Sequence, residues 1–591
     1  MKIFYSLMGL LAFTTAGFSQ NLVDLSLAGT YETGVFDDGA MEILAHDPVN
    51  HHVFVVNAST KSIDILDIST PSNITKVTSI DLSPYGKAAN SVSFFGGYVV
   101  AAVEDTVKQA NGKAVFFDDQ GTYVAHVMVG ALPDMVTFSH DGNTVLVANE
   151  GEPNDDYTVD PEGTVSIIDV SGGVANVTQS DVTEINFQSF NNNYDQDIRV
   201  FGPGATLAMD LEPEYIALSA DDAFAYVVMQ ENNAMAKIDL STNTVVSLKA
   251  LGFKDWMAGD NVLDASNTAA SVDLRHWPIY GMYQPDAMVA FEHNGSTYLA
   301  TANEGDSRDY DGFSEEDRVK DLLLDSVVFP NYANLQMNDS LGRMNITTTL
   351  GDTDNDGYYE ELYAYGARSF SIWDSNMNLV YDSEGDIASN VFLDYPNEFN
   401  SNNDDNTSFK SRSDDKGVEP EAVEVAVING TRVLFVGLER MGGVIVYDIT
   451  NPMAPQFVSY FLNRNFNVDA DAPGAGDLAP EDLVFISAAE SPTGYPLLAS
   501  ANEVSGTFSL YNIGGTIGLE EVVKESAIFA YPNPVVDVVT FNKDIENGLL
   551  YDMNGRVVSE VKGLEADLSD LAAGLYILMA DNVKGLQILK K

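Results

Sequence analysis

Acidic residues recur in pairs along this chain, and each pair brackets a pattern typical of a β-hairpin. Seven such pairs give fourteen positions, of which twelve are acidic, while Asn57 and Ser91 fill the other two. The acidic positions are Glu42, Glu104, Asp134, Glu150, Glu214, Glu231, Asp286, Glu304, Glu421, Glu439, Glu481 and Glu503. Carboxylates gathered in one place repel one another, so they recruit cations, bind a basic ligand or retain protons through raised pKa values.

A second acidic pattern lies between residues 351 and 361, where carboxylates alternate with other residues and Gly357 follows them. This spacing resembles the first half of an EF-hand loop, in which alternate oxygens converge on calcium and a glycine permits a sharp turn. The twelfth position is Tyr363, so Glu360 or Glu361 must supply any late carboxylate. The sequence predicts calcium as a cofactor, held by Asp352, Asp354, Asp356 and Glu361.

Basic residues are scarce, which draws attention to Arg308, Arg412, Lys416 and Arg440 near the paired acids. Such side chains orient a phosphate or carboxylate beside bound calcium, or they form structural ion pairs with nearby acids. The chain has no Gly-x-Ser-x-Gly, Walker loop or dinucleotide fingerprint, so an enzyme here would use carboxylates and metal-bound water. The candidate catalytic residues are Glu304, Arg308, Glu150 and Arg440.

The elements that position these acids repeat along the chain. Three pairs have their midpoints at Gly142, Gly295 and Gly430, each next to a residue that favours hairpin turns. A third strand pattern follows six of the hairpins, at residues 62–68, 164–170, 236–240, 369–374, 444–449 and 507–513. These repeats predict an all-β fold, a seven-bladed β-propeller over residues 20–515. A strand at residues 22–33 is predicted to close the ring as the fourth strand of blade seven.

Both acids of a pair emerge on one side of their hairpin, because the first strand begins beside the end of the second. If the first strand of each blade lines the central channel, the acids surround one mouth of that channel. The mouth would then hold calcium or another hard cation. The alternative interpretation is structural, with each carboxylate accepting backbone N–H groups from the neighbouring blade.

The charge composition of the chain limits the classes of binding partner that we expect. Lys and Arg total 29 against 88 Asp and Glu, a net charge of −59 that argues against nucleic acid and anionic membranes. Lys2 and the apolar run after it indicate a signal peptide over residues 1–19, and no later segment is predicted to span a membrane. Cysteine is absent, so this exported chain contains no disulfides.

Long insertions interrupt the repeats. The largest follows Glu304, and Ser314 with Asp317 predicts a short capped helix within it. Residues 382–416 are rich in Asn, Asp and Ser, which is typical of a solvated loop. The composition changes again after Gly515, which predicts a linker over residues 516–525 and a separate small β-domain over residues 526–591.

Several of these motifs resemble the choice-of-anchor I domain. They are the Asn-Glu-Gly segments at 148–153 and 302–308 together with residues 350–354, 365–373 and 416–421. The resemblance covers residues 25–515 and implies an exported propeller joined to a variable anchoring or sorting tail. Members of this family often carry alkaline phosphatase or esterase-like labels, and the resemblance supports the fold more firmly than it supports catalysis.

The tail resembles a type IX secretion C-terminal sorting domain, through residues 531–534, 550–556 and 571–578. This resemblance implies Sec export, contact with the type IX secretion machinery, and release or attachment at the cell surface. The other interpretation of the tail is a generic β-sandwich adhesion module.

Three functions fit these patterns. The first is a calcium-binding propeller that acts as a binding or scaffold module at the cell surface. The alternative is a calcium-dependent phosphoester hydrolase resembling alkaline phytases, which act on a phosphorylated small molecule, although phytase propellers usually have six blades. The third is recognition of basic peptides or polyamines by the acidic mouth, and propellers host both enzymes and binding proteins.

Overall fold

The structure is a computed structural model that describes residues 23–514, 530–531, 535–552, 556–580 and 583–591. The predicted signal peptide and linker lie outside these residues. The chain divides into two compact units, residues 1–515 and 516–591. Each unit is described by itself.

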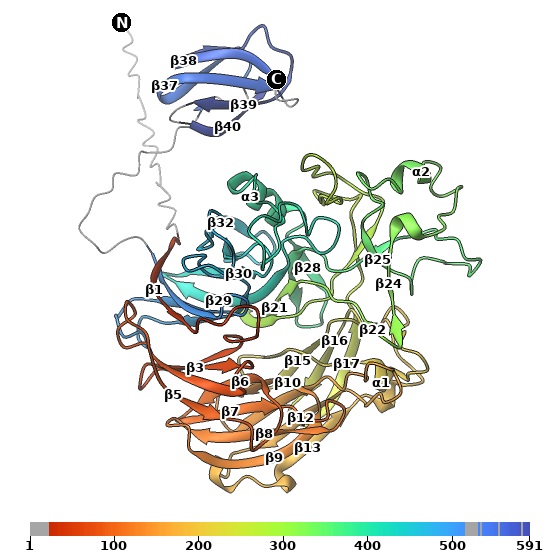
Figure 1. The fold of residues 1–591 in the computed structure, drawn as a ribbon, viewed down its shortest axis with the longest axis vertical. Coiled ribbons are helices and arrows are strands. Elements are labelled where there is room, and N and C mark those ends of the chain that lie inside the picture. The colour runs from red at the N-terminus through yellow and green to blue at the C-terminus, as the bar shows by residue number, and fades with distance from the viewer. Residues whose placement is uncertain (1–22, 515–529, 532–534, 553–555, 581–582) are drawn as a thin grey trace, which may run out of the picture. The chain divides into compact units, whose positions relative to one another are not determined.

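Seven four-stranded antiparallel sheets form the first unit among the described residues. The first four sheets follow one another directly along the chain (Figure 1). Their strands are β2 (Leu44–Asp47), β3 (His52–Asn57), β4 (Ser62–Asp67) and β5 (Thr75–Asp81); β6 (Ala89–Phe95), β7 (Tyr98–Val103), β8 (Asn111–Asp118) and β9 (Tyr123–Ala131); β10 (Pro133–Phe138), β11 (Thr144–Asn149), β12 (Thr164–Asp169) and β13 (Val182–Asn186); and β14 (Ile216–Leu218), β15 (Phe224–Met229), β16 (Ala234–Asp239) and β17 (Thr244–Ala250).

The last three sheets are separated by the insertions. Their strands are β20 (Met288–His293), β21 (Ser296–Asn303), β27 (Ser369–Asp374) and β28 (Leu379–Asp382); β29 (Pro420–Ile428), β30 (Thr431–Leu438), β31 (Val444–Asp448) and β32 (Gln456–Phe461); and β33 (Pro480–Ile486), β34 (Leu497–Asn502) and β35 (Thr507–Ile513) with β1 (Leu25–Glu32). We number these seven sheets as blades one to seven. The third strands predicted from the sequence are all present.

The first strands of neighbouring blades contact one another around a closed ring. These strands are β2, β6, β10, β14, β20, β29 and β33, and β33 contacts β2 again. The N-terminal strand β1 pairs antiparallel with β35, from Leu25 opposite Ile513 to Glu32 opposite Thr507. The predicted closure of blade seven by the N-terminal strand is therefore confirmed.

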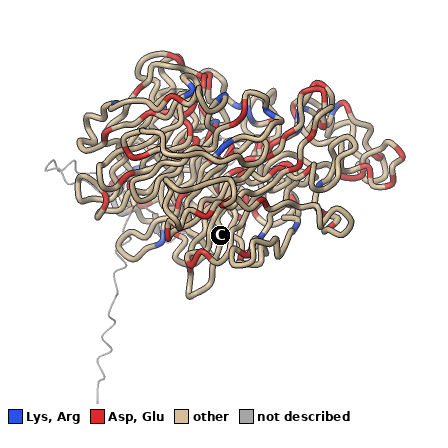
Figure 2. Tube along the Cα trace, turned by 90° about the horizontal axis from the view of Figure 1, so that it is seen from below, with Lys and Arg blue, Asp and Glu red and all other residues tan. Residues whose placement is uncertain are grey.

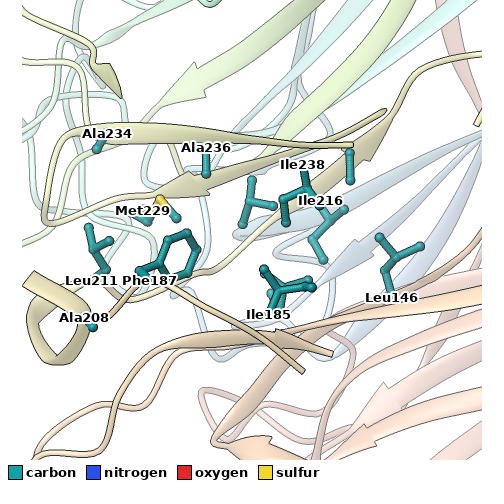
Figure 3. Packing of buried hydrophobic residues seen from close by; sticks show 14 of the residues in the cluster. Leu146, Ile185, Phe187, Ala208, Leu211, Ile216, Met229, Ala234, Ala236 and Ile238 are labelled. Atoms are coloured by element: carbon teal, nitrogen blue, oxygen red, sulfur yellow. The ribbon is translucent and has the colours of Figure 1, made fainter. Parts of the chain in front are cut away.

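Apolar cores fill the spaces between neighbouring blades, as expected for sheets packed face to face. Between blades three and four, Leu146 and Ile185 of one sheet face Ile216 and Ile238 of the next (Figure 3). The hairpin turns also follow the sequence. Asn294 and Gly295 both have positive φ, at 52° and 76°, as a type I′ turn requires.

The insertion after Glu304 differs from its prediction. Ser314 ends β23 and Asp317 lies within β24, because residues 316–318 pair with β25 and these cross-strand hydrogen bonds replace the predicted helical turn. The short elements of the insertions are β18 (Phe253–Asp255), β19 (Tyr280–Met282), β22 (Asp309–Tyr310), β23 (Phe313–Ser314), β24 (Glu316–Arg318), β25 (Asn345–Thr347), β26 (Tyr363–Ala364), α1 (Leu207–Asp210), α2 (Tyr332–Leu335) and α3 (Asp386–Asp394).

The segment between β28 and β29 is not the solvated loop that its composition predicts. It begins with α3, and its later polar residues Asn400, Asn403 and Lys410 are buried. Lys410 forms an ion pair with buried Asp264, 3.2 Å away. Asn403 donates to Glu439 of blade six, and Asn400 donates to Ser413 of the segment itself. Composition predicts solvent exposure only when polar side chains lack partners within the protein, and these side chains have them.

The second unit is a small sheet of β36 (Ala530–Tyr531), β37 (Val538–Asp552), β38 (Val557–Asp567), β39 (Gly574–Ala580) and β40 (Val583–Lys590). Val539, Phe541, Leu550 and Leu578 are among the residues of its own apolar core. In neither unit do the described residues include a helix long and apolar enough to cross a membrane.

Closure of the ring by β1 predicts that alanine substitutions at two leucines of this strand differ greatly in their effect on the free energy of unfolding. Leu25 is 3% exposed and packs in the core between blades six and seven, whereas Leu27 is 43% exposed. We expect Leu25→Ala to lower the free energy of unfolding by about 2–4 kcal/mol and Leu27→Ala to lower it by less than about 0.5 kcal/mol. Denaturant unfolding of the full chain measures both, and equal effects would contradict a closing role for this strand.

Candidate functional site

A central cavity of about 510 Å³ lies inside the ring and is lined by the first strands of the blades or the residues just before them. The first strands are therefore innermost, which was the condition for the paired acids to surround the mouth. One or more acids from six blades line this cavity, and those at the predicted positions are Glu42, Asp134, Glu214, Asp286 and Glu481. Acidic residues also far outnumber basic ones along the rest of the trace (Figure 2).

The register of blade two differs from the prediction by one residue. The backbone N–H of Glu104 donates to the carbonyl of Ala88. In blades three, six and seven the equivalent bonds reach the residue two positions before the paired acid, at Leu132, Glu419 and Ala479. By this register Asn90, and not Ser91, takes the place of the acid in blade two. Both are small polar residues, so composition alone could not distinguish them.

The residue two positions before the acid is strained in several blades. Leu132, Gln284, Glu419 and Ala479 all have positive φ, between 42° and 58°. Non-glycine residues adopt this left-handed conformation at a cost, and such residues gather at functional sites. This repeated conformation has no signal in the sequence, because none of the four residues is Gly or Asn.

Two compact groups of carboxylates meet on the side of the mouth formed by blades five and six. Asp286, Glu304 and Glu421 have carboxylate oxygens within 4.8 Å of one another, and so do Glu304, Glu419 and Glu439. Glu304 belongs to both groups and is 8% exposed. Glu421 has an oxygen, Oε2, with no hydrogen-bond partner among the described residues.

The second group contains its own cations. Glu419 is fully buried and accepts ion pairs from Arg412 at 2.7 Å, Lys416 at 3.4 Å and Arg440 at 2.8 Å. These three cations hold the pKa of Glu419 well below its usual range, although burial opposes them. Lys416 also pairs with Glu304, and Arg440 lies 3.1 Å from Glu439. The scarcity of bases makes these three residues stand out in the sequence, whereas Glu419 is one acid among many and has no such signal.

Most of the other acids of the mouth have raised pKa values, first because burial disfavours their charge and then because neighbouring carboxylates repel them. The pKa of Glu42 is raised to about 8, with Glu503 and Asp134 as neighbours. The pKa of Asp286 is also raised to about 8. That of Asp134 is raised to about 6 by burial, against the opposing charge of Lys108. The pKa values of Glu150, Glu214, Glu231, Glu421, Glu439 and Glu481 are raised well above their ordinary value.

Backbone hydrogen bonds between blades do occur, but other side chains accept them. Asp482 accepts the N–H of Leu44 at 2.9 Å, and Glu424 accepts that of Phe485 at 3.2 Å. Among the described residues, none of the twelve paired acids accepts a backbone N–H from a neighbouring blade. The hydrogen bonds between blades that the structural interpretation assigned to the paired acids are therefore made by other acids. Asp482 lies one residue beyond Glu481 on its first strand, and Glu424 lies three residues beyond Glu421.

Arg308 is a structural residue in this arrangement. It is 1% exposed, and its guanidinium lies 2.7 Å from Asp210, 2.9 Å from Glu212 and over the ring of Phe201. These contacts leave it enclosed within the protein. Arg440 keeps a quarter of its side chain exposed, so it remains the more accessible of the two candidate arginines.

The acidic loop after Gly351 gathers three of its four predicted ligands. Asp352, Asp354 and Asp356 have oxygens within 4.8 Å of one another, and Gly357 has the positive φ of a sharp turn. The fourth predicted ligand, Glu361, instead accepts the hydroxyl of Tyr363 at 2.6 Å. Glu360 lies against the loop and accepts two hydrogen bonds from Thr353, so it is better placed than Glu361 to supply a late carboxylate.

The closed ring of four-stranded sheets defines this protein as a β-propeller. The chain belongs to the family described as the Choice-of-anchor I domain, which matches residues 42–452. Residues 529–591 match the Secretion system C-terminal sorting domain. Both predicted resemblances are confirmed. The protein is therefore secreted or anchored at the cell surface, and its sorting tail implies interaction with the secretion machinery.

Two curated proteins are similar to parts of the chain. Gigasin-3a of Magallana gigas is 32% identical over 193 residues, which cover 31% of this chain and 67% of that protein. A mesenchyme-specific cell surface glycoprotein of Strongylocentrotus purpuratus is 24% identical over 307 residues, covering 45% of this chain and 38% of that protein. The chain thus spans well under half the length of the second relative.

Solved structures with similar folds share little sequence. Hydrazine synthase of Kuenenia stuttgartiensis has a TM-score of 0.43 at 12% identity, covering 82% of this chain and 99% of that one. The β-propeller domain of Cps50 (Swd1) from Myceliophteria thermophila has a TM-score of 0.40 at 8% identity, covering 83% of this chain and 99% of that one.

The raised pKa values predict a pH dependence of stability. Glu42 and Asp286 have folded-state pKa values of about 8 against ordinary values near 4, so the folded protein binds more protons than the unfolded chain between those pH values. The free energy of unfolding therefore falls as pH rises through this range. In chelator, we expect the melting temperature to drop by a few degrees between pH 6.5 and 8.5.

The window above pH 6.5 keeps opposing groups small. The pKa of Glu419 lies below its usual range and that of His46 is lowered to about 4, so neither changes protonation in the folded protein there. In the unfolded chain His46 has its ordinary pKa of 6.5, so it opposes the fall only at the lower edge of the window. Glu42→Gln should flatten the slope, because an amide does not titrate. A melting temperature that rises from pH 6.5 to 8.5 would contradict the assignment.

Proposed function

We propose that this protein is a secreted propeller that binds calcium at the mouth of its channel and acts as a binding or scaffold module at the cell surface. The observation that carries this proposal is the group formed by Asp286, Glu304 and Glu421. Its members come from adjacent blades, their oxygens converge within 4.8 Å, and Glu304 and Glu421 are at least nine-tenths buried.

A hard cation would relieve the repulsion within this group, because calcium takes several oxygen ligands and cancels their charge. The neighbouring group has Lys416, Arg412 and Arg440 for the same purpose, whereas Asp286 and Glu421 have no ion pair among the described residues. The unpartnered Oε2 of Glu421 is a further available ligand atom. The Asp352 loop is proposed as a second, exposed calcium site.

The role at the cell surface rests on the sorting tail and the absence of an evident nucleophile. One relative is named a cell surface glycoprotein, which agrees with a module that works outside the cell. Propellers serve as binding platforms as often as they serve as enzymes, so the fold itself does not decide.

If calcium binds at the mouth, the isosteric substitutions Glu304→Gln and Glu104→Gln should differ in their effect on calcium affinity. We expect calcium to raise the melting temperature of the full chain, and Glu304→Gln to weaken binding at the mouth by at least about tenfold because it removes a charge shared by both groups. Glu104→Gln is the matched control, since Glu104 pairs with Lys87 at 3.0 Å and belongs to neither group. Calorimetry with and without chelator measures both.

The loop gives a separate readout in the same experiment. Asp354→Asn should remove one weaker calcium equivalent while leaving the stabilisation from the mouth in place, because Asp354 is exposed on the insertion. Absence of calcium binding by the unaltered protein, or equal losses in Glu304→Gln and Glu104→Gln, would overturn the proposal.

A second candidate function is a calcium-dependent phosphoester hydrolase. It is favoured by one observation, the three bases Arg412, Lys416 and Arg440 beside the Asp286 group, which together could hold a phosphate next to a metal ion. In this hypothesis Glu304 would be a metal ligand and Arg440 would position the substrate. Each of these bases already pairs with Glu419, which makes this the less supported function.

Turnover decides between the two functions. If the protein is a hydrolase, a panel of phosphomonoesters, phosphodiesters and phytate should give calcium-dependent release of phosphate that falls at least about a hundredfold in Glu304→Gln. Arg440→Ala should raise the Michaelis constant. No turnover above that of Glu304→Gln would leave calcium binding without catalysis.

A further inference from the structure

The central cavity has a side that the calcium group does not use. Glu42, Asp134, Glu214 and Glu481 line it from blades one, three, four and seven. None of the four has an ion pair within 4.0 Å in the part of the chain that the structure describes. Glu104, Glu304 and Glu439, elsewhere at the mouth, each have one, so the acids on this side depend on a ligand for a cationic partner.

Glu214 independently indicates a ligand, because one of its buried oxygens has no hydrogen-bond donor among the described residues. It is 7% exposed, lines the cavity, and its Oε2 has no hydrogen-bond partner among the described residues. A buried carboxylate oxygen without a donor costs free energy unless a ligand or ordered water supplies one. The cavity beside it, at about 510 Å³, has room for a molecule of many atoms.

The spacing of these acids does not suit a metal ion. A divalent ion needs several oxygens to converge on one point. No group of three potential metal ligands within 4.8 Å contains Glu42, Asp134, Glu214 or Glu481 in the described residues. Separate positive charges joined by a flexible chain would match carboxylates that are spread around a ring.

Further acids line the cavity deeper in the channel. Glu424 lies three residues beyond Glu421 on β29, which is about 10 Å further along a strand. Asp482 lies one residue beyond Glu481. The apolar residues Met135, Val289 and Val484 also line the cavity, one to three residues beyond the paired acids of their strands. An alkyl chain would pack against them while its charged ends reach the paired acids and Glu424, as lysine side chains do on protein surfaces.

We propose that the channel binds a flexible alkylamine with two or more ammonium groups, one at the ring formed by Glu42, Asp134, Glu214 and Glu481 and another at Glu424. The ammonium groups donate to carboxylate oxygens, among them the unpartnered Oε2 of Glu214, and the methylene chain covers the apolar wall. The chemistry is shared by free polyamines and by lysine side chains. This site does not depend on calcium at the Asp286 group, so the two proposals fail separately.

The test is calorimetric titration of the full chain in chelator with spermidine, with tetralysine and with butylamine. We expect binding of one equivalent of spermidine or tetralysine that weakens as salt is added, and at least tenfold weaker binding of butylamine, which has a single ammonium. Binding of spermidine alone identifies a small polyamine site, and binding of tetralysine alone identifies a site for lysine-rich chains.

Isosteric variants separate a specific site from general attraction to a chain of net charge −59. Glu214→Gln and Glu424→Gln should each weaken binding at least tenfold, whereas Glu104→Gln, which lies outside the cavity lining, should not. If Glu214→Gln fails to fold, Glu424→Gln decides. No binding of either polycation, or the same affinity in all three variants, would overturn the proposal.

Discussion

Closure of the ring is the constraint on which the rest of the structure depends. The acids of different blades are separated by tens to hundreds of residues in the chain. They meet only because seven first strands are held side by side around one axis. The pairing of β1 with β35 fixes the last blade in this circle. Loss of that pairing would let the blades separate and relax the crowding of carboxylates at the mouth.

Two features of the structure reduce the electrostatic repulsion among these crowded carboxylates. On the side of blades five and six, Lys416 and two arginines neutralise Glu419 and part of Glu304. On the opposite side, the acids keep raised pKa values and have no protein cation as a partner among the described residues. The mouth therefore contains one group of acids, around Glu419, that has cations of its own, and other acids on both sides that have none among the described residues.

The repeats made much of the fold predictable from the sequence. Hairpin turns such as Asn294-Gly295 and the recurring third strands depend on local chemistry, which a single sequence displays directly. The site was only partly predictable. Glu419 and the position of Asn90 depend on register and on contacts between blades, and the polar residues Asn403 and Lys410 find their partners at Glu439 and Asp264, elsewhere in the chain. Such long-range partners leave no local pattern.

The position of β1 also has a consequence for biosynthesis. Among the strands of the propeller, β1 is synthesised first and its partner β35 is synthesised last, more than 470 residues later. No shorter nascent chain can complete blade seven, so the ring cannot close before nearly the whole propeller has been synthesised and exported. An unclosed chain exposes the edge of β35 and the apolar face that Leu25 covers, and this arrangement ties final folding to complete delivery across the membrane.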